Sequence, residues 1–365
     1  MVYRAIGLMS GSSLDGLDIA FVEFQEQGGK WTYHIKQTAC YIYDEEWRNR
    51  LANAILLTAQ DYQLLHTDFG HYIGEKVNAF IEDHELQFQV ALIASHGHTS
   101  FHIPAKKMTA QLGDGAAIAA TTQLPVITDL RAMDIAFGGQ GAPIVPVGEK
   151  LLMSEYAYFL NIGGIANISV NTDHYTAFDV CPANRVLNML ANEAGQPYDN
   201  GGAIAERGTI NKELLEKLDR LDYYKKPFPK SLANDFGTDI VYPLVKNSRL
   251  EPADALRTYT EHIAIQIKNA FSVLGNQKPK TTNHKLLVTG GGAFNRFLLT
   301  RLKEILQEIN IETIVPDPNL VSYKEALIMA FIGVLRWRQE YNVLSSVTGA
   351  SRDSIGGALW MGGEA

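Results

Sequence analysis

Two apolar runs near the start of the chain flank a short turn that is rich in glycine and serine. The runs cover residues 5–9 and 17–22, and Gly11, Ser12 and Ser13 lie between them. Apolar stretches of strand length separated by such a turn predict a β-hairpin. Its tip presents backbone N–H groups, hydroxyls and carboxylates. The tip is therefore either an anion site of the kind that holds phosphate or an ordinary tight turn.

The same pattern recurs near the middle of the chain, where apolar runs flank Gly163 and Gly164. A third glycine turn, Gly290-Gly291-Gly292, follows an apolar strand pattern and precedes apolar residues at helical spacing. A strand that leads through glycines into a helix directs N–H groups and the positive helix end at a ligand. Three such turns, two of them hairpins that head separate halves, predict a duplicated fold with a nucleotide between the halves.

Strands and helices alternate along the rest of the chain. Apolar residues recur on one face of a helix that Asp61 would cap, beginning with Leu64 and Leu65 and continuing to Ile81. Further helices are predicted over 45–58, 115–121, 184–194, 253–274, 294–309 and 323–338, and further strands over 89–94 and 125–130. The segment 137–143 is rich in Gly and Pro and predicts a crossing between domains, with a return near 343–349; both segments would act as hinges.

Composition fits a two-domain enzyme of the cytoplasm. The 365 residues are 46% hydrophobic and 20% charged, enough for a core in each half. The formal net charge of −8 and the lack of a Lys/Arg run argue against nucleic acid as a partner. Cys40 and Cys181 give neither a disulfide framework nor a zinc spacing. We expect no signal peptide and no membrane span, because no apolar run approaches about 18 residues.

Three histidines gather in residues 95–102. A metal site would need further ligands that converge with them, and no matching cluster of His or carboxylates is evident. The segment is better interpreted as a polar loop at the end of a strand, where α/β proteins place ligands. His96 and Thr99 would then donate hydrogen bonds to a substrate, and Arg131 would meet an anionic group.

Two acidic residues have alternative interpretations. Asp179 follows an apolar strand pattern and precedes Pro182 and Asn184, which end the strand and open a helix. It is either a general base at a cleft or a helix N-terminal acid that complements the dipole. Glu325 is either functional or a first-turn acid that forms a capping box with Ser322.

The motifs, taken together, resemble those of the anhydro-N-acetylmuramic acid kinases. The nucleotide signature of that family is similar to Gly11, Ser12, Ser13, Leu14, Asp15, Gly16, Leu17 and Asp18. Further matches follow in order at 95–97 and 99, 129–131, 138–143, 161–167, 290–295, 325–326 and 347–350. They cover nearly the whole chain, and the set is far more specific than any one glycine turn.

The resemblance implies an α/β fold of two ribonuclease-H-like domains, with mixed sheets flanked by helices and an ATP cleft between them. Residues 1–132 and 344–365 would form the N-terminal domain and 133–343 the C-terminal domain. The enzyme would use ATP and Mg²⁺ to open 1,6-anhydro-N-acetylmuramic acid with water and phosphorylate O6, a step in peptidoglycan recycling. A kinase of another sugar or carboxylate in the same superfamily and a non-catalytic ATP-dependent binding protein are the alternatives.

The resemblance also assigns roles to residues. Asp179 matches the catalytic Asp, and Glu325 matches an acidic residue that contacts the substrate. The remaining assignments are nucleotide binding by residues 11–18, Gly163, Gly164, Gly290, Gly291 and Gly292, and substrate binding by His96, Thr99 and Arg131. No direct metal ligand is assigned, although Asp15 or Asp18 would hold magnesium through water. The family suggests a homodimer, with the amino sugar and ATP as small-molecule partners.

This chain departs from the family pattern beside the catalytic Asp. The family has Asp-Thr-Gly-Pro-Gly-Asn, and here Cys181 and Ala183 replace the two glycines. A backbone φ above zero at either position would strain these residues; a differently packed loop would avoid the strain. His98 replaces a usual Gln and Ser12 a usual Thr, and each keeps a hydrogen-bonding group.

Overall fold

Two compact units make up the chain. The computed structural model describes residues 1–173, 175–227, 230–233, 235–274 and 279–363. Unit 1 consists of Met1–Met153 and Tyr323–Ala365, and unit 2 of Ser154–Ser322. Residues 133–153 and 323–343 therefore lie with unit 1, whereas the predicted boundaries place them in the C-terminal domain. The predicted division into 1–132 with 344–365 and 133–343 stays a prediction.

The segments predicted to act as hinges pack against each other inside unit 1. The Gln140 N–H donates to the Thr348 carbonyl at 2.8 Å. The buried Asp134 carboxylate accepts from the Gly141 N–H at 2.7 Å and from the Thr348 hydroxyl at 2.6 Å. The hinge prediction for these segments is wrong, because these bonds join them within one unit and the chain passes between the units elsewhere, after Met153 and before Tyr323.

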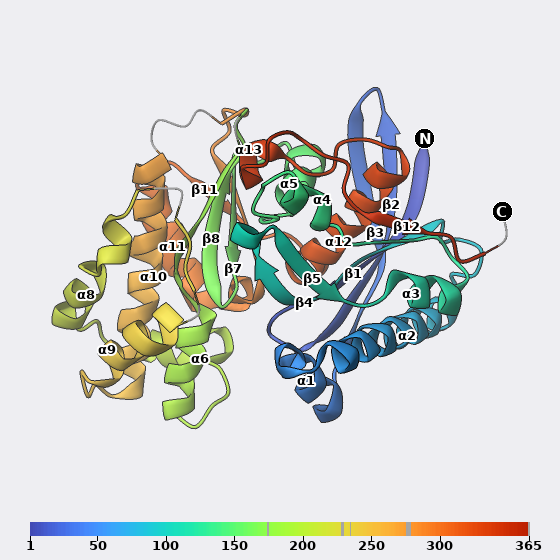
Figure 1. Ribbon diagram of the computed structural model, residues 1–365. Helices are drawn as coiled ribbons and strands as arrows, with labels where there is room; N and C mark the ends of the chain where they lie inside the picture. Colours follow the sequence, from blue (N-terminus) through green and yellow to red (C-terminus); the bar gives the residue numbers. More distant parts are fainter. Residues whose placement is uncertain (174, 228–229, 234, 275–278, 364–365) are drawn as a thin grey trace. The chain divides into compact units, whose positions relative to one another are not determined.

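The sheet of unit 1 is built on the predicted N-terminal hairpin. β1 (Val2–Ser10) and β2 (Gly16–Gln27) pair antiparallel, and β3 (Lys30–Ile42) extends the hairpin. β4 (Leu92–Ile103) pairs parallel with β1 on the other side. The strand order is β12-β6-β4-β1-β2-β3, and β5 pairs with β4 (Figure 1). The remaining strands are β5 (Met108–Leu112), β6 (Val126–Thr128) and β12 (Ala358–Trp360).

The sheet of unit 2 repeats this order. Its strands run β11-β10-β7-β8-β9, which matches β6-β4-β1-β2-β3, with an antiparallel hairpin followed by parallel neighbours in both. The strands are β7 (Tyr158–Ile162), β8 (Ile165–Val170), β9 (Thr176–Pro182), β10 (Lys285–Thr289) and β11 (Glu312–Ile314). The predicted α/β class, with two mixed sheets flanked by helices, is confirmed.

The long helix of unit 1 follows the predicted apolar periodicity with two differences. In α2 (Ala59–Asp83), the buried residues recur every three or four positions from Leu65 to Phe80. The N-cap is Thr58, which accepts from the Asp61 N–H, and Leu64 is 55% exposed, so Asp61 as cap and Leu64 as core residue were wrong. The predicted 45–58 helix divides into α1 (Glu45–Ala52) and a 3₁₀ turn; α3 (Gly115–Thr122), α4 (Ala132–Ala136) and α5 (Pro146–Leu152) follow.

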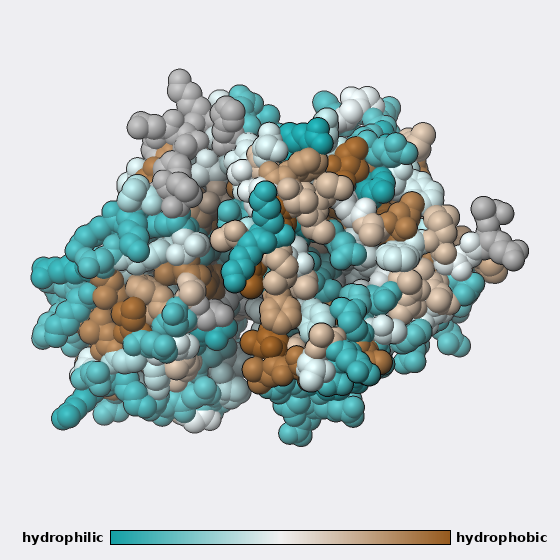
Figure 2. Space-filling view, viewed as in Figure 1, coloured by the Kyte–Doolittle hydropathy of each residue, from teal (hydrophilic) through white to brown (hydrophobic). Residues whose placement is uncertain are grey.

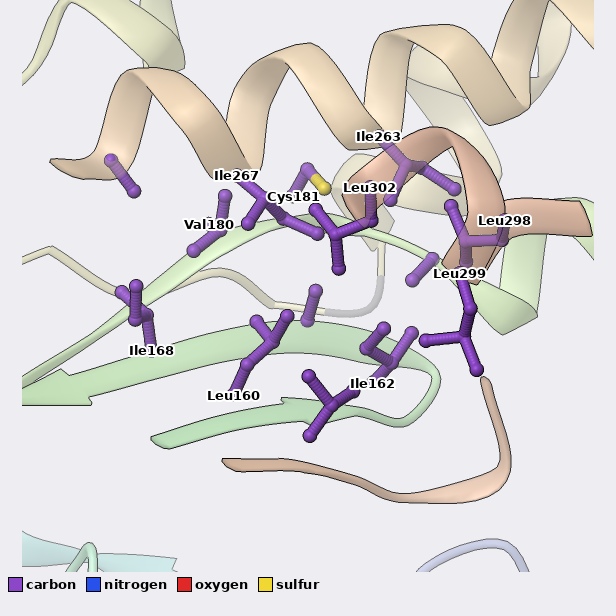
Figure 3. Close-up of a cluster of buried hydrophobic side chains, with 14 of the residues drawn as sticks. Leu160, Ile162, Ile168, Val180, Cys181, Ile263, Ile267, Leu298, Leu299 and Leu302 are labelled. Carbon is purple, nitrogen blue, oxygen red and sulfur yellow. The ribbon is translucent and has the colours of Figure 1, made fainter. Parts of the chain in front are cut away.

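Helices and strands of unit 2 share one apolar core. Leu160 and Ile168 of the strands meet Ile263 and Ile267 of one helix and Leu302 of another (Figure 3). These helices are α10 (Pro252–Leu274) and α11 (Arg296–Gln307), and α6 (Asn184–Glu193) joins them; the shorter helices are α7 (Ala203–Arg207), α8 (Lys212–Asp219), α9 (Tyr242–Lys246) and the 3₁₀ turn η4 (Asp222–Lys225).

The helix that carries Glu325 follows a kink. α12 (Pro318–Trp337) joins two helices across Tyr323, which has non-helical angles, so the segment that carries Glu325 begins close to the predicted residue 323. The capping box between Ser322 and Glu325 stays a prediction. By length and composition, α12 alone among the described helices passes as a membrane span. The most apolar 18-residue stretch of α12 is 72% buried inside the protein, and a helix of a protein core passes the same test of length and composition. α13 (Ser345–Thr348) is a single turn.

A buried ion pair fixes α12 to α5, and its loss should destabilise unit 1. Lys324 Nζ lies 2.9 Å from Glu149 Oε1, and both side chains are 5% exposed. Lys324→Met removes a buried cation 2.9 Å from the Glu149 carboxylate, so we expect the free energy of unfolding to fall by about 3–5 kcal/mol in urea titrations.

The control is Lys217→Met on α8, a helix whose surface is hydrophilic (Figure 2). Lys217 pairs with Glu213 in solvent, so the loss should be about 0.5 kcal/mol or less. Equal losses in the two variants would contradict the structural role of the buried pair.

Candidate active site

The tip of the β1–β2 hairpin is open and exposed. The Leu14 N–H closes the turn on the Gly11 carbonyl at 3.2 Å, with Leu14 itself at a φ of 59°. Ser12 and Ser13 are exposed, so their hydroxyls and amides are accessible to a ligand. Gly16 is required by packing, because a Cβ there would lie 2.6 Å from the Tyr41 carbonyl oxygen. The turn thus has the open backbone that an anion site needs.

Asp18 lies on β2 opposite Cys40 of β3. Burial raises the pKa of Asp18 to about 6, and the charges of Glu325 and Asp15 act in the same direction. A hydrogen bond from the Cys40 thiol opposes them; the pKa of this thiol is raised to about 12 by burial, so it stays a donor. Three carboxylates therefore share one electrostatic environment in unit 1. The sequence had given no indication of the role of Cys40.

His96 is held as a neutral imidazole of one tautomer. Its Nε2 accepts from the Arg131 Nε–H at 2.8 Å, so the proton resides on Nδ1 and is donated to the Gly97 carbonyl at 2.9 Å. Burial, with help from the Arg131 charge, lowers the pKa of His96 to about 3. His96 lies within β4, so the prediction of a polar loop over residues 95–102 is wrong. Ser95 and His98 pair with β1, and β5 pairs with β4 from His98 onward.

Arg131 bonds His96 and lies close enough to the carboxylates of Glu325 and Asp134 to interact with their charges. It also donates through Nη1 to the Gly141 carbonyl. Burial lowers the pKa of Arg131 to about 10, while the charges of Glu325 and Asp134 raise it. Burial raises the pKa of Glu325, and Lys324 and Arg131 oppose this. The structure thus brings His96 and Glu325 to Arg131, whose Nη2 donates to none of the described residues.

Thr99 and His98 lie on the same strand with different surroundings. Thr99 is exposed, and its hydroxyl accepts from the Gln111 amide at 3.4 Å. His98 is buried, and its Nδ1 lies 3.1 Å from the Ser10 hydroxyl, which also accepts from the Tyr43 hydroxyl at 2.8 Å. Because Ser10 directly precedes the glycine turn, this network fixes the start of the turn.

The two glycine turns of unit 2 lie side by side for different reasons. Gly290 has a φ of 82°, and a Cβ there would lie 2.5 Å from Asn161 Oδ1, so only glycine fits. A Cβ added to Gly292 would collide with the Ile162 side chain. At Gly163 and Gly164 neither φ nor packing requires glycine, since an added Cβ would meet nothing closer than 3.5 Å. The absent side chains leave this backbone open to a ligand.

The start of α6 completes the group of turns. Asn184 Nδ2 donates to the Ile162 carbonyl at 3.0 Å, and a Cβ on Gly291 would lie 3.5 Å from the same nitrogen. The next residue, Arg185, lies beside Gly164, and its Nε is buried without a partner among the described residues. A guanidinium there suits an anion. Its position in the first turn of a helix after a glycine hairpin was a signal that our sequence reasoning missed.

Asp179 lies on β9 opposite Asn167 of β8. The strand continues to Pro182 and α6 begins at Asn184, so the alternative of a helix N-terminal acid is wrong. The Leu232 N–H donates to Oδ2 at 2.8 Å, and Oδ1 accepts no bond from the described residues. Burial raises the pKa of Asp179, and the Leu232 bond lowers it. Oδ1 is thus the oxygen that is available to take a proton.

The replaced glycines of this loop cause no backbone strain. Neither Cys181 nor Ala183 has a positive φ, and Ala183 has a φ of −129°. Both are fully buried, and Cys181 lies in the core beneath α10 (Figure 3). The chain therefore avoids the strained turn by continuing β9 as a strand.

The described residues include no group of three or more His, Cys, Asp or Glu that could hold a metal ion. The available oxygen donors near the hairpin tip are the Asp15 and Asp18 carboxylates. This fits magnesium, which binds through one or two carboxylates and keeps water or phosphate in its other positions. The roles of the site residues in each unit remain those that the resemblance implies.

The model of the anhydro-N-acetylmuramic acid kinase family matches residues 3–362. The chain belongs to this family. A relative named anhydro-N-acetylmuramic acid kinase from Sulfurimonas denitrificans is 31% identical over 97% of this chain and 98% of its own length. One of the same name from Photobacterium profundum is 33% identical over 98% and 99%. Family membership confirms the predicted enzyme class, a kinase that uses ATP.

Likeness to solved structures is weaker. Component A of (R)-2-hydroxyglutaryl-CoA dehydratase from Acidaminococcus fermentans has a TM-score of 0.46 and 13% identity, over 90% of this chain and 96% of that one. A likeness at this level carries no argument about the family member described here.

Buried His98 should make stability depend on pH. Burial lowers its pKa from 6.5 to about 4. As pH falls below about 6.5, the unfolded chain binds a proton that the folded chain does not, so stability falls until about pH 4. We expect His98→Gln to reduce the loss of unfolding free energy between pH 7 and 5 by about 1–2 kcal/mol.

Urea unfolding at pH 7 and pH 5 gives the difference in unfolding free energy for each protein separately. Any effect of the substitution that does not depend on pH cancels in this difference. His34→Gln, at an exposed position on β3, is the control. The same pH dependence in His98→Gln as in the unmodified protein would exclude His98 as its source.

Proposed function

We propose that this kinase opens 1,6-anhydro-N-acetylmuramic acid with water and phosphorylates O6 from ATP, giving N-acetylmuramic acid 6-phosphate and ADP. The observation that carries the proposal is Asp179, a half-buried carboxylate with one oxygen held and the other available, in a chain that matches the family along its length. A base of this kind needs a fixed direction and a raised pKa, and Asp179 has both.

The proposed reaction balances around one water molecule. Asp179 Oδ1 takes a proton from the water as its oxygen bonds to the anomeric carbon, and the bond from that carbon to O6 breaks. The released O6 attacks the γ-phosphorus, and the bond from phosphorus to the ADP oxygen breaks. Holding the reactants in line supplies much of the rate enhancement. The Leu232 N–H keeps Oδ2 from turning into the position of Oδ1.

The substrate would be oriented by unit 1. Arg131 is fixed by His96 and Gly141, so its Nη2 can donate to the lactyl carboxylate of the sugar. His96 itself has both nitrogens engaged and acts by aiming Arg131, which refines its predicted role as a direct donor. Thr99 and Glu325 would hydrogen-bond sugar hydroxyls or the amide.

The nucleotide would bind at the glycine turns. Residues 11–18 of unit 1 and Gly163, Gly164 and Gly290–Gly292 of unit 2 are proposed to contact ATP, with Arg185 as an additional donor to its phosphates. Magnesium held through Asp18 or Asp15 would neutralise charge on the transferred phosphoryl group. Cys40 and Tyr43 then serve to hold Asp18 and Ser10 in place.

The expected setting is the cytoplasm, where the product enters peptidoglycan recycling, and the enzyme is proposed to act as a homodimer. A kinase of another sugar or carboxylate remains the alternative, and a non-catalytic ATP-binding protein is the second. A substrate panel assayed for ADP release with magnesium, followed by mass spectrometry of the product, distinguishes all three. Release of ADP with a different sugar alone would replace the proposed substrate.

Asp179→Asn should abolish turnover while leaving ATP binding nearly intact. Removing a general base typically costs about 100- to 10,000-fold in rate. The measurements are steady-state ADP release and calorimetric titration with an ATP analogue. Asp173→Asn is the control, since Asp173 is an exposed acid of unit 2 that pairs with Lys280. An Asp179→Asn rate above about a tenth of the unmodified rate would make Asp179 structural.

The source of the new oxygen tests the order of bonds. Reaction in ¹⁸O-water, quenched before the anomeric hydroxyl exchanges, should place the label on the anomeric carbon and leave the phosphate ester oxygen unlabelled. The reason is that O6 stays bonded to its carbon throughout. Label in the ester would refute this scheme and require separate hydrolysis and phosphorylation.

A further inference from the structure

Two buried tyrosine hydroxyls hold the backbone of β9 at Asp179 and at its end, Pro182. The Tyr223 hydroxyl of η4 donates to the Asp179 carbonyl at 2.6 Å, and the Tyr259 hydroxyl of α10 donates to the Pro182 carbonyl at 2.8 Å. Tyr223 is 5% exposed and Tyr259 is fully buried. Burial raises the pKa of both phenols, so both stay protonated and donate.

The hydrogen bonds of Asp179 leave a single atom unengaged. Its N–H donates to the Lys230 carbonyl at 3.2 Å, its carbonyl accepts from Tyr223, and its Oδ2 accepts from Leu232. Only Oδ1 has no partner among the described residues. The residue can therefore neither shift along the strand nor turn its carboxylate without breaking one of these bonds.

A separate network of hydrogen bonds engages Tyr224, the residue that follows Tyr223. His262 of α10 bonds Asp219 Oδ1 through Nδ1 at 2.6 Å and the Tyr224 hydroxyl through Nε2 at 3.0 Å. The Gln266 amide donates to the same Asp219 oxygen at 2.8 Å. Tyr224, the neighbour of Tyr223, therefore bonds α10 and not Asp179, so its hydroxyl offers a matched control for that of Tyr223.

We propose that Tyr223 and Tyr259 are positioning residues for Asp179, holding the end of β9 so that Oδ1 faces the attacking water. The inference rests on the proposed function of Asp179 as general base. It assigns a task to two residues whose hydroxyls bond backbone carbonyls of β9. Their importance follows from the steep dependence of such reactions on geometry, since a displacement of about 1 Å costs on the order of 100-fold in rate.

The positioning role has a signature in the pH profile. The titratable groups around Asp179 are Tyr223, Lys230 and Cys181, and burial is the main cause of its raised pKa. Without the Tyr223 hydroxyl, the Asp179 carbonyl needs another donor, and water that enters to serve it also solvates the carboxylate. The pKa of Asp179 then falls, and the acid limb of kcat moves to lower pH.

The experiment compares two adjacent tyrosines in the full-length enzyme. Tyr223→Phe should lower kcat about 10- to 100-fold, with KM for ATP within about twofold and the acid limb at lower pH. Tyr224→Phe removes the neighbouring hydroxyl, which bonds His262 rather than Asp179, and should leave kcat and the acid limb nearly unchanged. The melting temperatures of both variants show how far each substitution destabilises the fold, so that a fall in kcat can be separated from a loss of stability.

Tyr259→Phe provides an independent second variant if Tyr223→Phe does not fold, and it should also lower kcat with KM for ATP unchanged. If the unmodified enzyme turns over and Tyr223→Phe or Tyr259→Phe has the same kcat as Tyr224→Phe, the positioning role is wrong. The proposed function is not affected by that result. A fall in kcat in Tyr223→Phe without a shift of the acid limb would assign Tyr223 to general packing and overturn the positioning role as well. No turnover by the unmodified enzyme would overturn the proposed function together with it.

Discussion

The parallel pairing of each hairpin with a later strand is the constraint on which both units depend. β4 lies beside β1, and the register places Ser10 opposite His98. The polar residues of β4 are thereby brought to the glycine turn of the first hairpin. In unit 2, β10 lies beside β7, and this puts Gly290 against Asn161 and Ile162. Each sheet edge therefore gathers chain segments that are far apart in sequence.

Burial sets the chemistry of the groups that gather there. Withdrawal from water favours the uncharged form, which keeps His96 neutral and raises the pKa of Asp18, Glu325 and Asp179. Partners then decide which atoms remain free. Arg131 is aimed by His96, and the Asp179 carboxylate is anchored through Oδ2. In both cases a backbone or side-chain bond leaves one donor or acceptor atom without a partner among the described residues.

The departures from the family pattern beside Asp179 are absorbed by secondary structure. Cys181 and Ala183 have negative φ, and the stretch through Pro182 pairs with β8 as a strand. Ladder bonds and the Tyr259 hydroxyl satisfy this backbone. The thiol and the methyl group enter the apolar core, where side chains without hydrogen-bonding demands are favoured.

The sequence by itself determined the elements whose signals are local. Both hairpins, α6 and α10 follow from apolar periodicity and glycine turns within about 20 residues, and the ordered motifs were enough to indicate the family. Tertiary structure alone decided that Leu64 is exposed and that His96 lies in a paired strand. It also decided the association of Gly141 with Thr348 and the hydrogen-bond partners of Asp179. Tyr223 and Leu232 lie 44 and 53 residues from Asp179. No local pattern encodes such contacts, because they arise only when packing of the sheet and helices brings distant segments to the same end of a strand.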